Sequence, residues 1–192
     1  MNLRAVGSVI PLALAGPAWA HAGLHHDQSS LVAGLLHPIG GTDHLLAMIA
    51  IGLWAAISGG RTMLALPASF LASMTAGFGL ALAGVAPPMV EPAILGSLMV
   101  LGTLVALSVR LPDAYACALV APMGLAHGIA HANELGGSSA PVFLVGFIVT
   151  TALLHLVGLI AGAVLARPGA TLATRATGGI VCILGGSLII AG

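Results

Sequence analysis

Six long apolar segments follow one another along this chain, and they constrain its fold more than any other feature. A helix needs about 20 apolar residues to cross a bilayer. Only 5% of the chain is charged, whereas a soluble domain carries about 25% charged residues. No strand pattern is visible, so we predict an all-α, polytopic bundle of six transmembrane helices that forms one domain, residues 31–192. The predicted spans are Leu31–Ser58, Met63–Ala83, Pro92–Val109, Ala114–Ala132, Pro141–Ala166 and Ala176–Ala191.

The first segment is too long for one straight span and contains Pro38, Gly40 and Gly41. Proline and glycine both weaken a helix interior. Irregular backbone at membrane depth is tolerated where it lines a cavity or packs against protein. We therefore predict that the first span is broken near Pro38–Gly41.

Glycines recur in the later segments at spacings that allow close helix packing. Gly124 and Gly128 form one small-xxx-small motif, and Gly158 and Gly162 form another. The pairs Gly178-Gly179 and Gly185-Gly186 suggest tight packing of the last span. No glycine pattern typical of nucleotide binding follows a strand.

The first twenty residues have the pattern of a secretory signal peptide. Arg4 precedes a short apolar run, and Ala18-Trp19-Ala20 fits the small-residue cleavage rule. Cleavage there would leave a tail, residues 21–30, on the outer side of the membrane. This tail is either a polar lead-in or a collector of metal ions. Its candidate metal ligands are His21, His25 and His26.

The arginines predict how the spans are oriented. A cleaved signal places the mature N-terminus outside, so the connections after spans one, three and five face the cytoplasm. Those connections hold Arg61, Arg110, Arg167 and Arg175, and the outer connections between spans contain neither Lys nor Arg. This is the positive-inside pattern. It predicts that both ends of the mature chain lie outside.

Two clusters of ionisable residues lie where apolar sequence is expected: His37-Pro38-Ile39-Gly40-Gly41-Thr42-Asp43-His44 and His127-Gly128-Ile129-Ala130-His131-Ala132-Asn133-Glu134. Such groups cost roughly 2.5–3.5 kcal/mol each at the centre of a bilayer, which makes them candidates for function. Imidazoles and carboxylates are also transition-metal ligands. The ionisable residues of the second cluster share one helix face, and the predicted topology puts both clusters at the outer end. We predict one metal site built from His37, Asp43, His44, His127, His131 and Glu134.

Two further polar residues are weaker candidates. Glu91 begins span three at the outer face, where it either adds charge at the entrance or caps the helix. His155 lies deep in span five, as a second station for the ion or as a polar group bonding across helices. Both alternatives stay open for both residues.

The two histidine motifs resemble signatures of the HupE/UreJ family, which are small bacterial membrane proteins linked to hydrogenase and urease and regarded as nickel or cobalt permeases. The matching patterns are His37-Pro38-x-x-Gly41-x-Asp43-His44 and His127-Gly128-x-Ala130-His131-x-x-Glu134. The resemblance implies a multi-pass protein of the bacterial inner membrane with periplasmic termini. It also implies that the six motif residues serve transport and that the protein has an indirect link to nickel-enzyme maturation. One departure is Ala126, where the family often has Phe.

These patterns favour a transporter over an enzyme. We expect facilitated, potential-driven import of Ni2+, with Co2+ as the second candidate, through an outer vestibule of His, Asp and Glu, without a resident cofactor. The chain has no Lys, which excludes a P-loop ATPase, and no basic patch for nucleic acid. The expected partners are the divalent ion and the lipid bilayer, and a homo-oligomer is left open. The alternative is a metal-dependent intramembrane hydrolase that uses the same ligands to activate water.

Overall fold

The structure is a computed structural model that describes residues 30–165 and 171–191. Within these ranges all regular secondary structure is helical, which confirms the predicted all-α class. The predicted signal peptide, His21, His25 and His26 lie outside the described residues. The seven helices are α1 (Ser30–Gly40), α2 (Thr42–Ser58), α3 (Thr62–Leu82), α4 (Val90–Ala106), α5 (Asp113–Asn133), α6 (Ala140–Leu165) and α7 (Thr171–Ala191).

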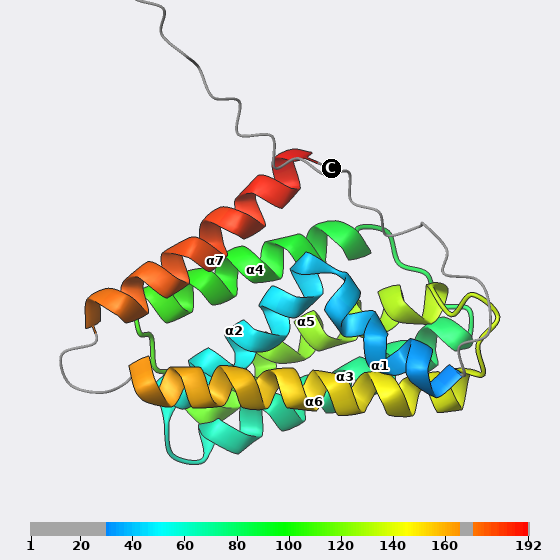
Figure 1. The fold of residues 1–192 in the computed structure, drawn as a ribbon, viewed down its shortest axis with the longest axis horizontal. Helices are drawn as coiled ribbons and strands as arrows, with labels where there is room; N and C mark the ends of the chain where they lie inside the picture. Colours follow the sequence, from blue (N-terminus) through cyan, green and yellow to red (C-terminus); the bar gives the residue numbers. More distant parts are fainter. Residues whose placement is uncertain (1–29, 166–170, 192) are drawn as a thin grey trace, which may run out of the picture.

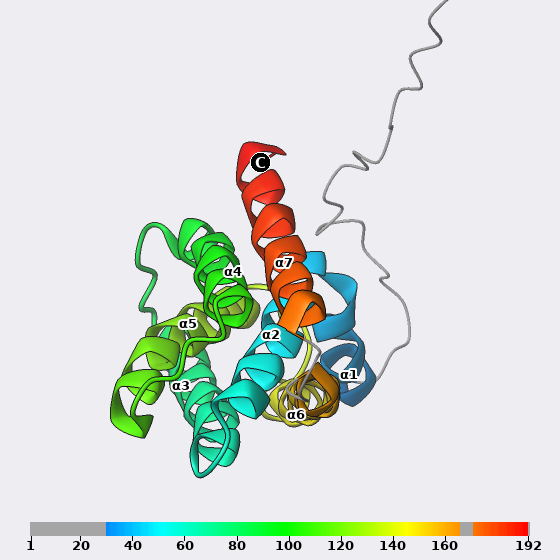
Figure 2. The same cartoon turned by 90° about the vertical axis from the view of Figure 1, so that its left-hand side faces the viewer.

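The helices pack mainly as three pairs, α3 with α5, α2 with α6, and α4 with α7, and α1 packs on α6 (Figure 1). Viewed from one end, α2 lies in the middle of the bundle, between α6 and the α3–α5 pair (Figure 2). Most of α2 is accordingly buried. His44, in the first turn of α2, is therefore held inside the bundle, whereas Asp43 is half-buried and Thr42 is exposed.

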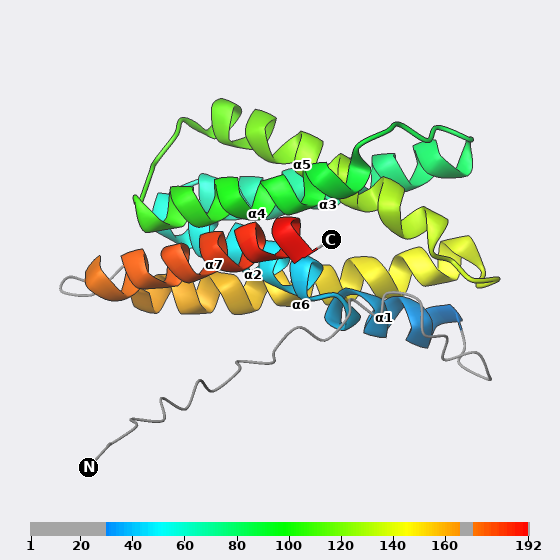
Figure 3. The same cartoon turned by 90° about the horizontal axis from the view of Figure 1, so that it is seen from above.

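The connections gather at two opposite ends of the bundle. Those between α2 and α3 and between α4 and α5 lie at one end, and those between α3 and α4 and between α5 and α6 lie at the other (Figure 3). Arg167 lies outside the described residues. Arg61 and Arg110 lie at the first end, and Arg175 lies near the start of α7. This is the grouping that the orientation prediction requires, and the side of the membrane that each end faces stays a prediction.

The chain turns sharply at Gly41, where α1 and α2 meet at an angle of 81°. Gly41 is extended, with φ −103° and ψ 123°. A Cβ at this position would lie 2.9 Å from Asp43 Oδ1 and 3.0 Å from His44 Nδ1. The predicted break is confirmed, but Pro38 does not make it, because α1 continues through Pro38 to Gly40.

Glycines allow the paired helices to approach closely. A Cβ on Gly128 of α5 would lie 1.9 Å from the Met74 carbonyl oxygen of α3. A Cβ on Gly158 of α6 would lie 2.1 Å from the Ile49 carbonyl oxygen of α2. The predicted packing role of both small-xxx-small motifs is confirmed.

Only one glycine of each pair in α7 packs tightly. A Cβ on Gly178 would lie 2.2 Å from the Ala106 nitrogen, and one on Gly185 would lie 2.7 Å from Leu98 Cβ. Gly179 and Gly186 have nothing within 4 Å of such an atom. The prediction for these two was wrong, because adjacent helical residues point about 100° apart and only one of them can face α4.

Among the helices of the described ranges, three are long and apolar enough to cross a membrane: α3, α6 and residues 172–190 of α7. The bent pair α1–α2 is a fourth if it counts as one span. Helix α4 is apolar but has only 17 residues, and α5 has 21 residues but carries His127, His131 and Asn133 near its end. That α4 and α5 also cross the membrane, as the six-span bundle requires, therefore remains a prediction.

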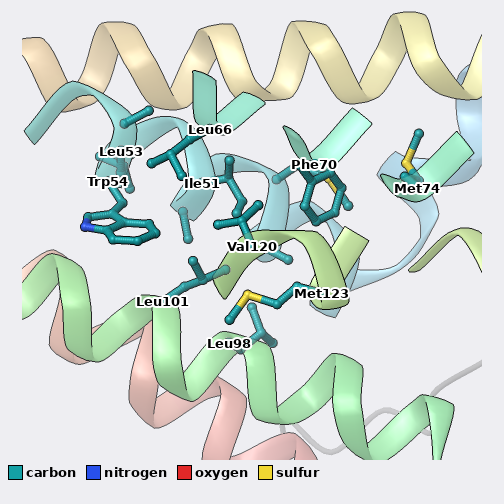
Figure 4. Packing of buried hydrophobic residues seen from close by; sticks show 14 of the residues in the cluster. Ile51, Leu53, Trp54, Leu66, Phe70, Met74, Leu98, Leu101, Val120 and Met123 are labelled. Atoms are coloured by element: carbon teal, nitrogen blue, oxygen red, sulfur yellow. The ribbon is translucent and has the colours of Figure 1, made fainter. Parts of the chain in front are cut away.

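Apolar side chains from α2, α3, α4 and α5 meet in the interior (Figure 4). Trp54, Phe70 and Leu101 are fully buried there. At the end that carries Arg110, the indole Nε1 of Trp54 donates to the Val109 carbonyl oxygen at 2.8 Å. This core fixes α2 against α5, the two helices that carry His44 and His127 toward the opposite end of the bundle.

Candidate metal centre at the helix break

Three side chains from the two predicted clusters meet at one place. His37 lies near the end of α1, His131 in the last turn of α5, and Glu134 immediately after α5. His37 Nε2 donates to Glu134 Oε2 at 2.7 Å, and His131 Nδ1 lies 3.4 Å from the same oxygen. One ligand atom from each residue lies within 4.8 Å of the others. Small side-chain rotations would let these atoms bind one ion.

Asp43 and His44 lie beside this group in the first turn of α2. His44 Nδ1 donates to Asp43 Oδ1 at 3.0 Å. The His44 ring contacts that of His131, with centroids 4.1 Å apart, and that of His127 at 5.0 Å. The turn at Gly41 thus places His44 against α5, so the two clusters adjoin. Asp43, His44 and His127 do not belong to the three-residue group whose atoms could share one ion, so a single site built from all six residues stays a prediction.

The ring nitrogens of His44 and His127 have defined roles. His127 Nδ1 donates to the Met123 carbonyl oxygen at 2.7 Å, and His44 Nδ1 donates to Asp43. A neutral imidazole carries one proton, so Nε2 keeps a lone pair in both rings. Each Nε2 is buried and has no hydrogen-bond partner among the described residues. Metal-binding histidines commonly donate in this way from the nitrogen that does not bind the metal.

His131 lies between these groups and is 1% exposed. Neither of its ring nitrogens has a hydrogen-bond partner in the part of the chain that the structure describes. A buried polar group left without a partner costs about 1–3 kcal/mol. A cation bound at the nitrogen that carries the lone pair would remove this cost for that nitrogen, and Glu134 Oε2, 3.4 Å from Nδ1, is close enough for a small movement to let it accept the proton of the other nitrogen. The donor set thus fits a transition-metal ion.

The cluster runs from partly exposed side chains to buried ones. The side chains of His37 and Glu134 are 26% and 29% exposed, whereas His127 is fully buried. Burial alone raises the pKa of the Glu134 carboxyl, but the imidazoles of His131 and His37 outweigh burial and hold that pKa below its usual range. Glu134 is therefore negatively charged at the outer rim of the cluster.

Residues 9–188 match the model of one protein family, described as HupE / UreJ protein. The chain belongs to the HupE/UreJ family. It is 38% identical over 180 residues to "Protein HupE" from Rhizobium leguminosarum bv. viciae, and the match covers 93% of each chain. No solved structure matches the chain. The family resemblance inferred from the two motifs is confirmed.

The two weaker candidate metal ligands of this HupE/UreJ protein, Glu91 and His155, lie apart from the cluster. Glu91 is exposed in the first turn of α4, and its side chain has no hydrogen bond or ion pair with any residue that the structure describes. His155 is buried in α6, with its ring centroid 5.3 Å from that of Phe70. Neither belongs to the three-residue group that could share one ion.

Aromatic rings line the cluster and were not predicted as site residues. Phe143 contacts His37 with centroids 5.3 Å apart, and Phe147 contacts His131 at 4.2 Å. Phe70 of α3 contacts His127 at 5.2 Å. In the sequence of α6, Phe143, Phe147, Thr151 and His155 are spaced four residues apart, and the structure buries all four. Such a stripe is also what a core-facing helix shows, so it does not by itself indicate a site.

Proposed function

We propose that this HupE/UreJ protein imports Ni2+, with Co2+ as a second ion, across the bacterial inner membrane by facilitated, potential-driven diffusion. The observation that carries the proposal is the convergence of histidines from the helix break and from α5 at one end of the bundle. There the centroid of the His44 ring lies 5.0 Å from that of His127 and 4.1 Å from that of His131. The Nε2 atoms of His44 and His127 are buried without a hydrogen-bond partner among the described residues. Imported nickel would then supply nickel enzymes, which is an indirect link implied by the family.

The ligand types support a transition-metal ion. Neutral imidazoles bind Ni2+, Co2+ and related ions well, whereas Mg2+ and Ca2+ prefer oxygen ligands. Asp43 and Glu134 offset the double positive charge of the ion as it loses part of its hydration shell. The partly exposed pair His37–Glu134 would meet the ion first, and the buried histidines would receive it next.

The driving force follows from the orientation predicted by the arginines. If the end with Arg61 and Arg110 faces the cytoplasm, the cluster faces the periplasm. A divalent ion that moves inward then gains roughly 4.6 kcal/mol per 100 mV of membrane potential, twice the value for a single charge. This energy supports accumulation of the ion without ATP.

Uptake of radioactive nickel tests the proposal in cells that lack their own nickel importer and express this chain. We expect His44→Ala and His131→Ala each to lower the rate at least about tenfold, since ligand loss weakens metal binding. Thr75→Ala is the control, because Thr75 is exposed on α3 and donates only to the Leu71 carbonyl oxygen at 2.8 Å. Immunoblots establish equal protein levels, and other divalent ions compete in parallel.

Two outcomes would overturn the proposal. One is nickel uptake that neither substitution changes. The other is metal-dependent hydrolysis of a lipid or peptide by the purified protein that His131→Ala abolishes while nickel uptake continues. The second outcome would favour the hydrolase alternative, in which Glu134 acts as a general base.

A further inference from the structure

His155 is a buried histidine that the outer cluster does not use. It lies past the midpoint of α6 and is 1% exposed. Both of its ring nitrogens are buried and have no hydrogen-bond partner among residues 30–165 and 171–191. A histidine kept only for packing would normally satisfy at least one nitrogen, since buried polar groups are almost always hydrogen-bonded.

Thr151 lies one turn before His155 on the same buried face of α6 and is completely buried. Its hydroxyl also has no hydrogen-bond partner within the described ranges. Threonines elsewhere in the bundle behave differently: Thr103, for example, donates to the carbonyl oxygen four residues earlier, at 2.7 Å. Side chains four residues apart on a helix are neighbours. A free hydroxyl oxygen therefore lies one turn from a free imidazole.

The outer cluster connects to this pair through Phe70. The Phe70 ring contacts His127, with centroids 5.2 Å apart, and His155 at 5.3 Å. On α6, Phe147 contacts the outer His131 at 4.2 Å, and Thr151 and His155 follow at successive turns toward the other end. Both sets of contacts place His155 and Thr151 next in line, inward from the outer histidines.

We propose that His155 and Thr151 form a second, internal site for a divalent transition-metal ion, which receives the ion from the outer cluster by way of His127. This inference rests on the proposed function. One imidazole and one hydroxyl, with water at the remaining positions, bind such an ion more weakly than the outer donor set does. Conduction requires sites that an ion can leave, so a weaker inner site suits onward release.

Titration of the purified full chain with Co2+ tests this inference. Visible absorption of Co2+ reports the ligand set, and calorimetry with Ni2+ reports the number of sites. The protein carries His21→Ala, His25→Ala and His26→Ala and a tag without histidine, so that only the helical bundle contributes histidine ligands. We expect a tight site and a weaker one. His155→Leu should abolish the weaker site alone, and His131→Ala should weaken the tight site at least tenfold.

Ser97→Ala is the control, because Ser97 is buried in α4 and its hydroxyl is satisfied by the Ile94 carbonyl oxygen at 2.6 Å. It should keep both sites. His155→Asn keeps a polar side chain of smaller size and replaces His155→Leu if that variant does not fold. Either His155 variant should lower nickel uptake at least tenfold while the tight site stays intact.

The inference is overturned if a folded His155 variant still shows both the tight site and the weaker site. It is also overturned if the parent protein has a single binding site, whose affinity falls in His131→Ala and is unchanged in the His155 variants. The proposed function survives that result. If the parent protein neither binds nor imports these ions, the inference and the proposed function fail together.

Discussion

The proton on one nitrogen of a histidine decides what the other nitrogen can bind. In His44 and His127 that proton is directed at a carboxylate and at a backbone carbonyl, respectively. Both rings are thereby held in one orientation with Nε2 free, before any ion arrives. The sequence identified these residues as ligand candidates, but it could not show which nitrogen is available. Every residue has a backbone carbonyl, so the sequence does not indicate that the carbonyl of Met123 accepts a hydrogen bond from His127.

Asp43 substitutions test how much this orientation contributes. In Asp43→Asn the amide oxygen can still accept the His44 Nδ1–H, whereas Asp43→Ala leaves that proton without its partner. Loss of such a contact typically lowers metal affinity about 10- to 100-fold. We expect Ni2+ affinity, measured by calorimetry, to fall about tenfold in Asp43→Asn, because the negative charge is lost, and further in Asp43→Ala, because the hydrogen bond is lost as well. Tyr115→Phe, at an exposed side chain of the opposite end, is the control.

Equal affinities for Asp43→Ala and the parent protein would show that Asp43 neither orients His44 nor binds the ion. Equal losses in the two Asp43 variants would instead assign the effect to the negative charge.

Among the elements, the helix break shows what a motif can and cannot predict. Pro38, Gly40 and Gly41 all weaken helices, so the sequence placed a break among them. The structure assigns the turn to Gly41, where an added Cβ would crowd Asp43 and His44. Helix propensity describes only local preferences, whereas the position of the turn depends on how α1 packs on α6 and α2 packs inside the bundle.

Gly41→Ala should therefore impair the site without unfolding the protein. The backbone of Gly41 is one that alanine adopts readily, but the methyl group would displace the Asp43–His44 pair. We expect roughly tenfold weaker Ni2+ binding and an almost unchanged melting temperature. Gly40→Ala is a matched control, because nothing lies within 4 Å of a Cβ there. Equal affinity in the two variants would show that the pair tolerates the methyl group.

The glycines of α3 offer a second matched pair. A Cβ on Gly77 would lie 2.2 Å from the Leu125 carbonyl oxygen of α5, whereas Gly79 has nothing within 4 Å. Both substitutions gain about 1 kcal/mol of helix propensity, but overpacking costs about 1–3 kcal/mol. We expect Gly77→Ala to lower the melting temperature of the detergent-solubilised protein, and Gly79→Ala to leave it equal or higher. Similar values for both would argue against close α3–α5 packing.

For the whole molecule, the two ends of the bundle differ in chemistry. One end holds the described arginines, and the other holds the His, Asp and Glu cluster. The sequence predicted that both motifs lie at the same end, because spans can be counted. It could not predict that His37 bonds to Glu134 across 97 residues of chain, or that α6 supplies the aromatic lining. Such contacts depend on which helices are neighbours, and hydropathy does not encode that.

Single cysteines test the orientation. Ser139→Cys lies in the connection before α6, at the end with the histidines, and Ala114→Cys lies in the first turn of α5 at the arginine end. Both are made in a chain with Cys117→Ser and Cys182→Ala. We expect a membrane-impermeant maleimide to label Ser139→Cys in intact spheroplasts and Ala114→Cys only after lysis. The reverse labelling would invert the orientation and with it the proposed direction of transport.

The hydrogen bond between His37 and Glu134 has a consequence for biosynthesis. Synthesis starts at the N-terminus, so α1 and α2 enter the membrane while Glu134 and α6 are still untranslated. A nascent chain that ends before α5 holds His37, Asp43 and His44 but none of the groups that complete the cluster. The complete cluster of His, Asp and Glu side chains can assemble only late, after α5 has been inserted beside α3 and α6 has been inserted beside α1 and α2. A chain whose synthesis stops before α5 therefore lacks His127, His131 and Glu134 and cannot form the complete cluster.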